Sequence, residues 1–185
     1  AGAWGYLKTW EKIIERSIDK NYDRILCLDD DVFFHKDFER QFAISVRHIP
    51  PDWKLLYLGA SQHSWTLNGS LFYPNRNITS LQEDQPCYHP ALTDGSFAVG
   101  VHSTVFRVIL EEIRKMNCSL DSGPLRKVMR IFPNRCFVLM PNLIIADVSD
   151  SDIGNSRNQA DHAIKMKWDL SRYDLNPAEN LVSVI

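Results

Sequence analysis

The amino-terminal part of the chain carries apolar residues at the three-to-four spacing of an amphipathic helix. They are Trp4, Leu7, Trp10, Ile13, Ile14 and Ile18, and the pattern ends near Asn21. A second helix is expected through Phe38, before Pro50 terminates it. Two further helices are predicted, one capped by Ser103 and one that starts at Asp121.

Four short apolar runs lie between these helices and predict β-strands. They cover residues 23–28, 53–59, 96–101 and 136–140, and they read as strands buried in a sheet. Because helices and strands alternate, we predict an α/β fold with a Rossmann-type, mostly parallel sheet flanked by helices.

The periodic pattern is lost between residue 60 and about residue 92, where Ser, Asn, Gln, Gly and Pro dominate. A loop of this length tends to be functional or disordered. Its aromatic residues offer either a stacking surface for a sugar or anchors for packing. They are His63, Trp65, Phe72, Tyr73 and Tyr88. From Gly154 onward the chain is again polar and only weakly periodic.

Composition narrows the class of protein. The 185 residues, 44% of them hydrophobic, suit one domain with a substantial core. The net charge of −2 gives no bulk attraction to nucleic acid, and no apolar stretch is long enough to span a membrane. The four cysteines lack the close spacing of a structural zinc site, and Cys27 and Cys136 fit core positions in strands. Three Asn-x-Ser/Thr sequons leave the compartment open.

Three adjacent carboxylates, Asp29, Asp30 and Asp31, follow the first predicted strand. Like charges this close raise one another's pKa unless a cation or several donors neutralise them. Mn²⁺ or Mg²⁺ prefers carboxylate oxygens and keeps positions free for substrate phosphates. The carboxyl end of a strand in an open α/β sheet is also where ligands bind. The triplet therefore predicts a divalent-cation site, and the alternative is a solvated turn that caps the next helix.

Four segments in this order resemble glycosyltransferase family 25, which includes lipooligosaccharide and collagen galactosyltransferases. They are the Trp10 helix leading into 28–32, the strand 53–59, the segment 95–109, and the segment 141–153 that ends in Ser151-Asp152-Ile153. Two positions depart from the family pattern. Asp29 stands where a Glu is usual, and Ala146-Asp147 replaces a Gln that often precedes Ser-Asp-Ile.

The resemblance implies a GT-A-like fold whose first strands, those that hold the nucleotide base, lie outside this sequence. Residues 1–153 would form the partial core, and 154–185 a polar carboxyl-terminal segment or lid. It further implies an inverting transfer of a hexose, galactose by analogy, from a uridine-diphosphate sugar to a hydroxyl of a glycan or other acceptor. The expected role is in lipopolysaccharide biosynthesis. A cytoplasmic location, with or without attachment to a membrane, is favoured, and the ER or Golgi lumen is the alternative.

Within this scheme, Asp29 and Asp31 are the expected metal ligands. Asp30, on the other side of the strand, would face the sugar or cap the turn at Phe33. Asp121 is the expected catalytic base, with Asp94 as the alternative, although either could simply cap a helix or form a turn. In the last segment, Arg157 and Lys165 would offset the charge of the diphosphate, and His162 would complete the metal shell.

Two other functions fit parts of the pattern. A haloacid-dehalogenase-like phosphatase also places Asp-x-Asp after an apolar strand, with Asp29 as nucleophile and Asp31 as acid and base. However, Phe33 stands where that pattern wants Thr or Val. The second alternative is a catalytically silent sugar-binding domain. An EF-hand is excluded because its calcium-loop pattern does not occur.

Overall fold

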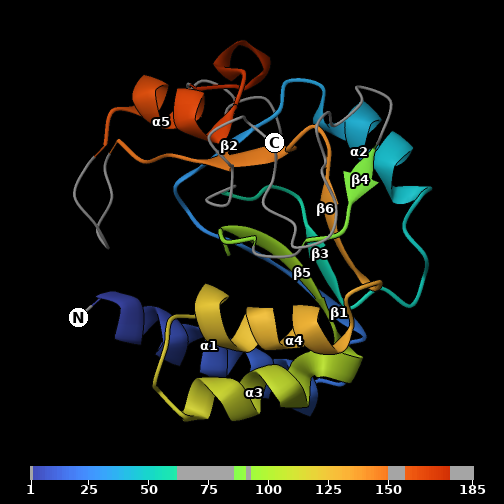
Figure 1. Ribbon diagram of the computed structural model, residues 1–185. Coiled ribbons are helices and arrows are strands. Elements are labelled where there is room, and N and C mark those ends of the chain that lie inside the picture. The colour runs from blue at the N-terminus through green and yellow to red at the C-terminus, as the bar shows by residue number, and fades with distance from the viewer. Residues whose placement is uncertain (1, 62–85, 91–92, 150–156, 176–185) are drawn as a thin grey trace, which may run out of the picture.

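The computed structural model describes residues 2–61, 86–90, 93–149 and 157–175 (Figure 1). Its first helix, α1 (Gly2–Asp19), follows the predicted amphipathic pattern and buries Leu7, Trp10 and Ile14. The four predicted strands are present as β1 (Arg24–Leu28), β3 (Leu55–Tyr57), β5 (Ala98–His102) and β6 (Cys136–Leu139). With the short β4 (Cys87–Tyr88) they form one sheet in the order β1-β5-β3-β6-β4.

The expectation of a mostly parallel sheet is wrong. Among the described strands of this sheet only β3 and β6 pair in parallel, whereas β1 with β5, β3 with β5 and β4 with β6 pair antiparallel. A parallel pair needs a long crossover connection, and the sequence from residue 60 to 92 has no helical period that would supply one. The fold is α/β with a mixed sheet.

The strand directions nevertheless place the ends of several strands at one edge of the sheet. The strands β1, β3 and β6 run the same way, because β1 and β3 are both antiparallel to β5 and β6 is parallel to β3. Their carboxyl ends therefore lie beside the amino end of β5. This edge receives the acidic triplet after Leu28 and the segment that precedes Ala98.

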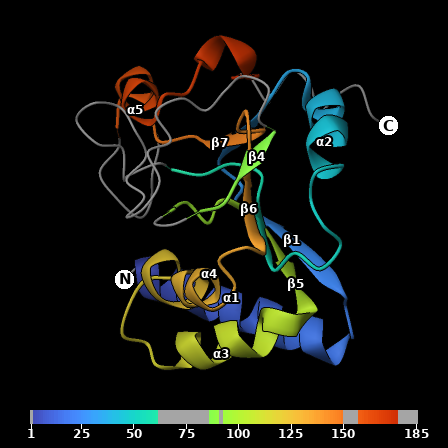
Figure 2. The same ribbon diagram turned by 45° about the vertical axis from the view of Figure 1, so that its right-hand side comes forward.

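One face of the sheet packs against α1, α3 (Phe106–Arg114) and α4 (Arg126–Ile131), which lie together in Figures 1 and 2. Leu55 and Tyr57 of β3 point into this core, whereas Leu56 points into the core on the other face. The prediction that β3 is buried on both faces is confirmed.

The second core lies between the sheet and elements that the sequence pattern did not reveal. These are a two-stranded sheet of β2 (Val32–Phe34) and β7 (Ile144–Ala146), and the helix α5 (Gln159–Met166). The predicted helix α2 (Phe38–Val46) packs beside them through Phe38 and Phe42. Tyr88, a candidate for stacking on a sugar, is instead 4% exposed and part of the first core.

Three details of the predicted elements need correction. The strand β1 is not buried, because it ends the strand order of the described sheet and leaves Leu26 and Leu28 exposed. Cys27 is accordingly half-buried, whereas Cys136 is fully buried as predicted. Ser103 does not cap the third helix. The His102 side chain accepts the Thr104 N–H at 3.3 Å instead, in the turn η1 (Ser103–Val105) that precedes α3.

Candidate functional site

The acidic triplet is the short link between β1 of the five-stranded sheet and β2 of the two-stranded sheet. The Asp29 N–H donates to the Phe97 carbonyl at 2.9 Å, and the Asp31 carbonyl accepts the Asp147 N–H at 2.7 Å. Asp29 is half-buried, whereas Asp30 and Asp31 are exposed. The triplet is thus held by its backbone at the junction of two sheets.

The side chain of Asp29 is tied to α1 and to the start of β5. The Tyr6 hydroxyl lies 3.0 Å from Asp29 Oδ1 and 3.1 Å from Ser96 Oγ. Burial raises the pKa of Asp29 to about 6, the hydrogen bond from Tyr6 opposes this rise, and the charges of Asp31 and Asp30 add to it. Asp29 is therefore a carboxylate whose pKa its surroundings raise well above the usual value.

Asp121 reaches the same place from a different part of the chain. It begins η2 (Asp121–Leu125), a π-helical turn that leads into α4. Burial raises the pKa of Asp121 to about 6, and the charges of Asp94 and Asp29 add to this rise, whereas hydrogen bonds from the Gly95 N–H and the Ser96 hydroxyl oppose it. The fold thus brings together three residues that the sequence singled out separately, Asp29, Asp94 and Asp121.

Asp94 has an ion-pair partner, whereas one oxygen of Asp121 has no hydrogen-bond partner among the described residues. Arg126 Nη2 lies 2.9 Å from Asp94 Oδ1, and both side chains are mostly buried. The Asp94 carbonyl also accepts the Ser61 N–H at 2.7 Å, which fixes it beside the end of β3. Asp121 Oδ1, by contrast, is buried without a hydrogen-bond partner among the described residues. The two candidates for the base therefore have different environments.

A glycine makes this arrangement possible. Gly95 has φ +108°, a conformation that side-chain-bearing residues rarely adopt, and a Cβ there would lie 2.7 Å from the Ser61 nitrogen. The sharp backbone turn places Asp94 on Arg126 while the next N–H and the Ser96 hydroxyl reach Asp121.

Sequence reasoning missed the neutral and basic members of this cluster. Tyr6 was hidden on an apolar helix face, and Arg126 was one of many basic residues in an amphipathic pattern. The only sequence signal for Ser96 was its position next to Asp94-Gly95. π-Helical turns often mark functional sites, but η2 gives no distinct sequence pattern.

The three site residues predicted in the last segment, Arg157, His162 and Lys165, lie on α5 or just before it. The Arg157 N–H donates to the Val148 carbonyl at 2.8 Å, next to the Asp147 that bonds to the triplet, and the Arg157 side chain is exposed. Lys165 is exposed on α5. His162 is buried, with its ring edge-on to Trp168 at a centroid distance of 5.2 Å.

Within the described ranges, no group of three or more His, Cys, Asp or Glu side chains is arranged to hold a metal ion. Asp29, Asp31 and His162 do not form such a group. A hard cation at a diphosphate nevertheless needs only one or two protein carboxylates, because waters and phosphate oxygens complete its shell. An exposed Asp31 next to a half-buried Asp29 fits this requirement, and the metal assignment stays a prediction.

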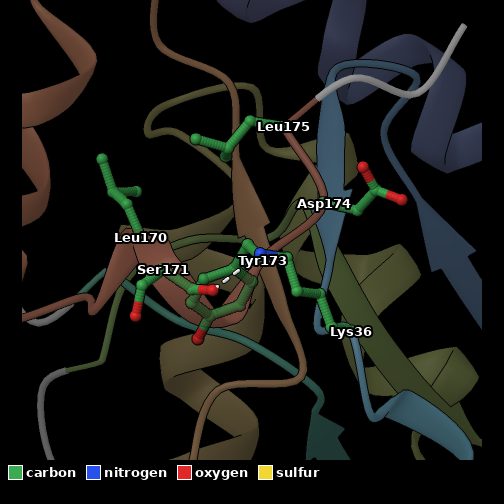
Figure 3. Close-up of a pocket in the computed structure, with 6 residues that line it drawn as sticks. All are labelled: Lys36, Leu170, Ser171, Tyr173, Asp174 and Leu175. Atoms are coloured by element: carbon green, nitrogen blue, oxygen red, sulfur yellow. Dashed lines mark hydrogen bonds between the residues drawn. The ribbon is translucent and has the colours of Figure 1, made fainter.

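A shallow pocket of about 450 Å³ lies elsewhere, around the end of the described chain (Figure 3). Its lining residues are Lys36, Leu170, Ser171, Tyr173, Asp174 and Leu175. Lys36 Nζ donates to the Ser171 carbonyl at 2.8 Å across it. None of the predicted site residues lines this pocket.

No protein-family model matches the chain, and no curated protein matches it. The resemblance to glycosyltransferase family 25 therefore rests on the sequence segments alone. In the part of the chain that the structure describes, no helix has both the length and the apolar character needed to cross a membrane.

Proposed function

We propose that this chain carries the catalytic centre of a metal-dependent, inverting hexosyltransferase with a GT-A-like fold. Its donor would be a uridine-diphosphate sugar, with galactose as the first candidate, and its acceptor a hydroxyl of a glycan or similar molecule. One observation carries the proposal. Asp29 and Asp121, predicted for two different roles, share a single polar network with Tyr6 and Ser96 at the sheet edge.

The proposed metal ligands are Asp29 and Asp31, and His162 is not included because its ring is buried against Trp168. When bound, Mn²⁺ or Mg²⁺ would stabilise the charge that develops on the departing diphosphate. Tyr6 fixes the Asp29 carboxylate by its hydroxyl, so this ligand is held in one orientation before any substrate arrives. Arg157, beside the same edge, is the proposed basic partner of the diphosphate, with Lys165 as the second candidate.

Asp121 is the proposed base and Asp94 the less suitable one. The base takes the proton of the acceptor hydroxyl as the acceptor oxygen bonds to the anomeric carbon and the bond to the diphosphate oxygen breaks. Such a group works best with a pKa near the operating pH, and burial raises that of Asp121 to about 6. Asp94 is the less suitable candidate because its carboxylate is already engaged in an ion pair with Arg126 Nη2 at 2.9 Å.

The test is a transfer and donor-hydrolysis assay on the complete gene product, with UDP-galactose, UDP-glucose and UDP-N-acetylglucosamine in the presence of Mn²⁺. Asp31→Asn and Asp121→Asn should each reduce turnover by at least about a hundredfold, because they remove a metal ligand and a base. Asp52→Asn is the matched control, since Asp52 is an exposed aspartate that pairs with Arg135 outside the site. Unchanged turnover in both site variants would refute the assignment.

The same protein separates the two alternatives. A silent sugar-binding domain would turn over no donor, and calorimetry would show no metal-dependent affinity for uridine diphosphate. A phosphatase would release phosphate from a simple ester such as p-nitrophenyl phosphate without any nucleotide sugar.

A further inference from the structure

Three buried polar atoms beneath the site have no hydrogen-bond partner among the residues that the structure describes. They are Tyr57 Oη, Asp121 Oδ1 and Arg126 Nε. Tyr57 is 0% exposed, so its hydroxyl cannot turn toward solvent. Buried polar atoms are nearly always paired, by protein or by ordered water, and three on neighbouring elements point to a common partner.

The three residues belong to one neighbourhood. The Arg126 N–H donates to the Asp121 carbonyl across the π-helical turn η2, so both side chains leave the same short segment. The charge of Asp121 acts on the Tyr57 hydroxyl more strongly than that of any other group, and the charge of Asp94 also reaches it. Arg126 in turn contacts Asp94 at 2.9 Å.

Their chemistry is complementary. The Arg126 Nε–H can only donate, the ionised Asp121 oxygen can only accept, and the Tyr57 hydroxyl can do either. We propose that one buried water molecule accepts hydrogen bonds from Tyr57 Oη and Arg126 Nε and donates one to Asp121 Oδ1. Such a water has the two to four polar partners that buried waters need. Tyr57 and Arg126 are then positioning residues for Asp121.

This inference deepens the proposed function and rests on it for the meaning of Asp121 as a base. The bridging water donates a hydrogen bond to Asp121 Oδ1, and the Gly95 N–H and the Ser96 hydroxyl donate hydrogen bonds to the same carboxylate. The ionised form is thereby favoured against the cost of burial. The titratable and charged groups that face Asp121 are Asp29 after β1, Tyr57 of β3, Asp94 before β5 and Arg126 of α4, with Tyr6 of α1 reached through Ser96.

The experiment follows the Asp121 carboxyl by ¹³C NMR in the complete protein, with Asp121→Asn to assign its resonance. In Tyr57→Phe the titration midpoint of Asp121 should move up by about half to one pH unit, a three- to tenfold gain in proton affinity. The ring keeps its volume, so no cavity forms. Tyr173→Phe is the matched control, because that buried hydroxyl donates to the Asn142 carbonyl at 2.6 Å instead, and its removal should leave the midpoint unchanged.

Arg126→Gln should move the midpoint in the same direction, although it also removes a charge, so Tyr57→Phe is the decisive variant. A high-resolution crystal structure of the unmodified protein should show an ordered water within hydrogen-bond distance of all three atoms. An unchanged midpoint in Tyr57→Phe, or a protein atom in that position, overturns the inference. Transfer activity is measured in parallel. A shifted midpoint without activity contradicts the proposed function only, whereas activity with an unshifted midpoint overturns this inference and leaves the proposed function standing.

Discussion

Asp121, the proposed base, is a half-buried carboxylate with a raised pKa. Burying an ionised carboxylate is unfavourable, and here two neighbouring carboxylates, Asp94 and Asp29, make it more so. The fold retains the group although it lowers stability at neutral pH. Such a conflict between local cost and retention is expected at functional positions.

Asp121→Asn tests this cost directly. The folded-state pKa of Asp121 is raised from 3.8 to about 6, so the folded protein binds more protons than the unfolded chain in this window. The contribution of Asp121 to stability is thus fully present below about pH 4 and is lost as the pH rises through 6. The parent protein should lose stability between pH 4 and pH 7.5, whereas Asp121→Asn should not. The free energy of unfolding of the variant should therefore rise by about 1 to 3 kcal/mol relative to that of the parent over this range. Urea unfolding at both pH values measures it.

Asp94→Asn supplies the contrast at the same pH values. Its loss leaves the mostly buried Arg126 without its ion-pair partner, so this variant should be destabilised at neutral pH. If Asp121→Asn showed the same pH dependence as the parent protein, the raised pKa of Asp121 would be wrong.

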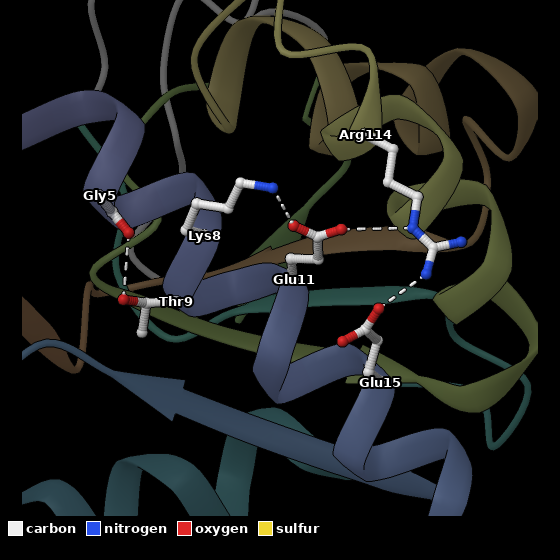
Figure 4. Close-up of polar contacts among 6 residues, drawn as sticks. All are labelled: Gly5, Lys8, Thr9, Glu11, Glu15 and Arg114. Carbon is white, nitrogen blue, oxygen red and sulfur yellow. Dashed lines mark hydrogen bonds and ion pairs between the residues drawn. The ribbon is translucent and has the colours of Figure 1, made fainter.

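At the scale of elements, α1 and α3 are joined by buried apolar side chains and, at the edge of this contact, by ion pairs. Figure 4 shows Arg114 of α3 bridging Glu11 and Glu15 of α1, at 3.3 and 2.7 Å. Lys8 adds a contact to Glu11 within α1. Beneath these ion pairs, Ile113 is 0% exposed. We expect the buried apolar contacts, rather than the ion pairs, to hold the two helices together.

Paired variants at adjacent positions separate the two contributions. Arg114→Met should cost less than about 1 kcal/mol, because the side chain is 55% exposed and solvent screens its ion pairs. Ile113→Ala should cost about 2 to 5 kcal/mol, because it opens a cavity in the core. Equilibrium unfolding in urea gives both values. A larger loss in Arg114→Met than in Ile113→Ala would reverse this ranking of forces.

Element prediction succeeded where periodicity was long or apolar runs were continuous, as in α1 and β3. It failed for β2 and β7, which have three residues each and owe their form to pairing with one another. The helix α5 was missed because its inward positions include Ala163 and a buried histidine among polar neighbours.

The site divides in the same way. Carboxylates can be picked out from local sequence, and Asp29, Asp94 and Asp121 were all found so. The roles that we propose for them could not be assigned from the sequence, because the proposal depends on the ion pair of Arg126 with Asp94 and on the hydrogen bond from Tyr6 to Asp29. Both contacts join residues far apart in sequence, so only the tertiary structure reveals them.

At the scale of the whole molecule, two cores lie on opposite faces of one sheet, and the acidic triplet stands where the main sheet passes into the small one. The segment expected as a polar tail or lid contributes to the second core through Ala163, Met166 and Trp168. Gln159 ties α5 to β7, since its side chain accepts the Val148 N–H at 2.9 Å and donates to the Ala146 carbonyl at 3.1 Å.

Two substitutions on α5 test whether this segment unfolds with the rest of the molecule. Met166→Ala should cost about 2 to 5 kcal/mol, because Met166 is 2% exposed within the second core, whereas Ile164→Ala should change stability by less than about 0.5 kcal/mol, because Ile164 is 77% exposed. Far-UV circular dichroism and tryptophan fluorescence should report one coincident urea transition in both variants, shifted only in Met166→Ala. A segment that acts as a detachable lid would instead melt in an earlier, separate transition, with equal and small effects of the two substitutions on the main one.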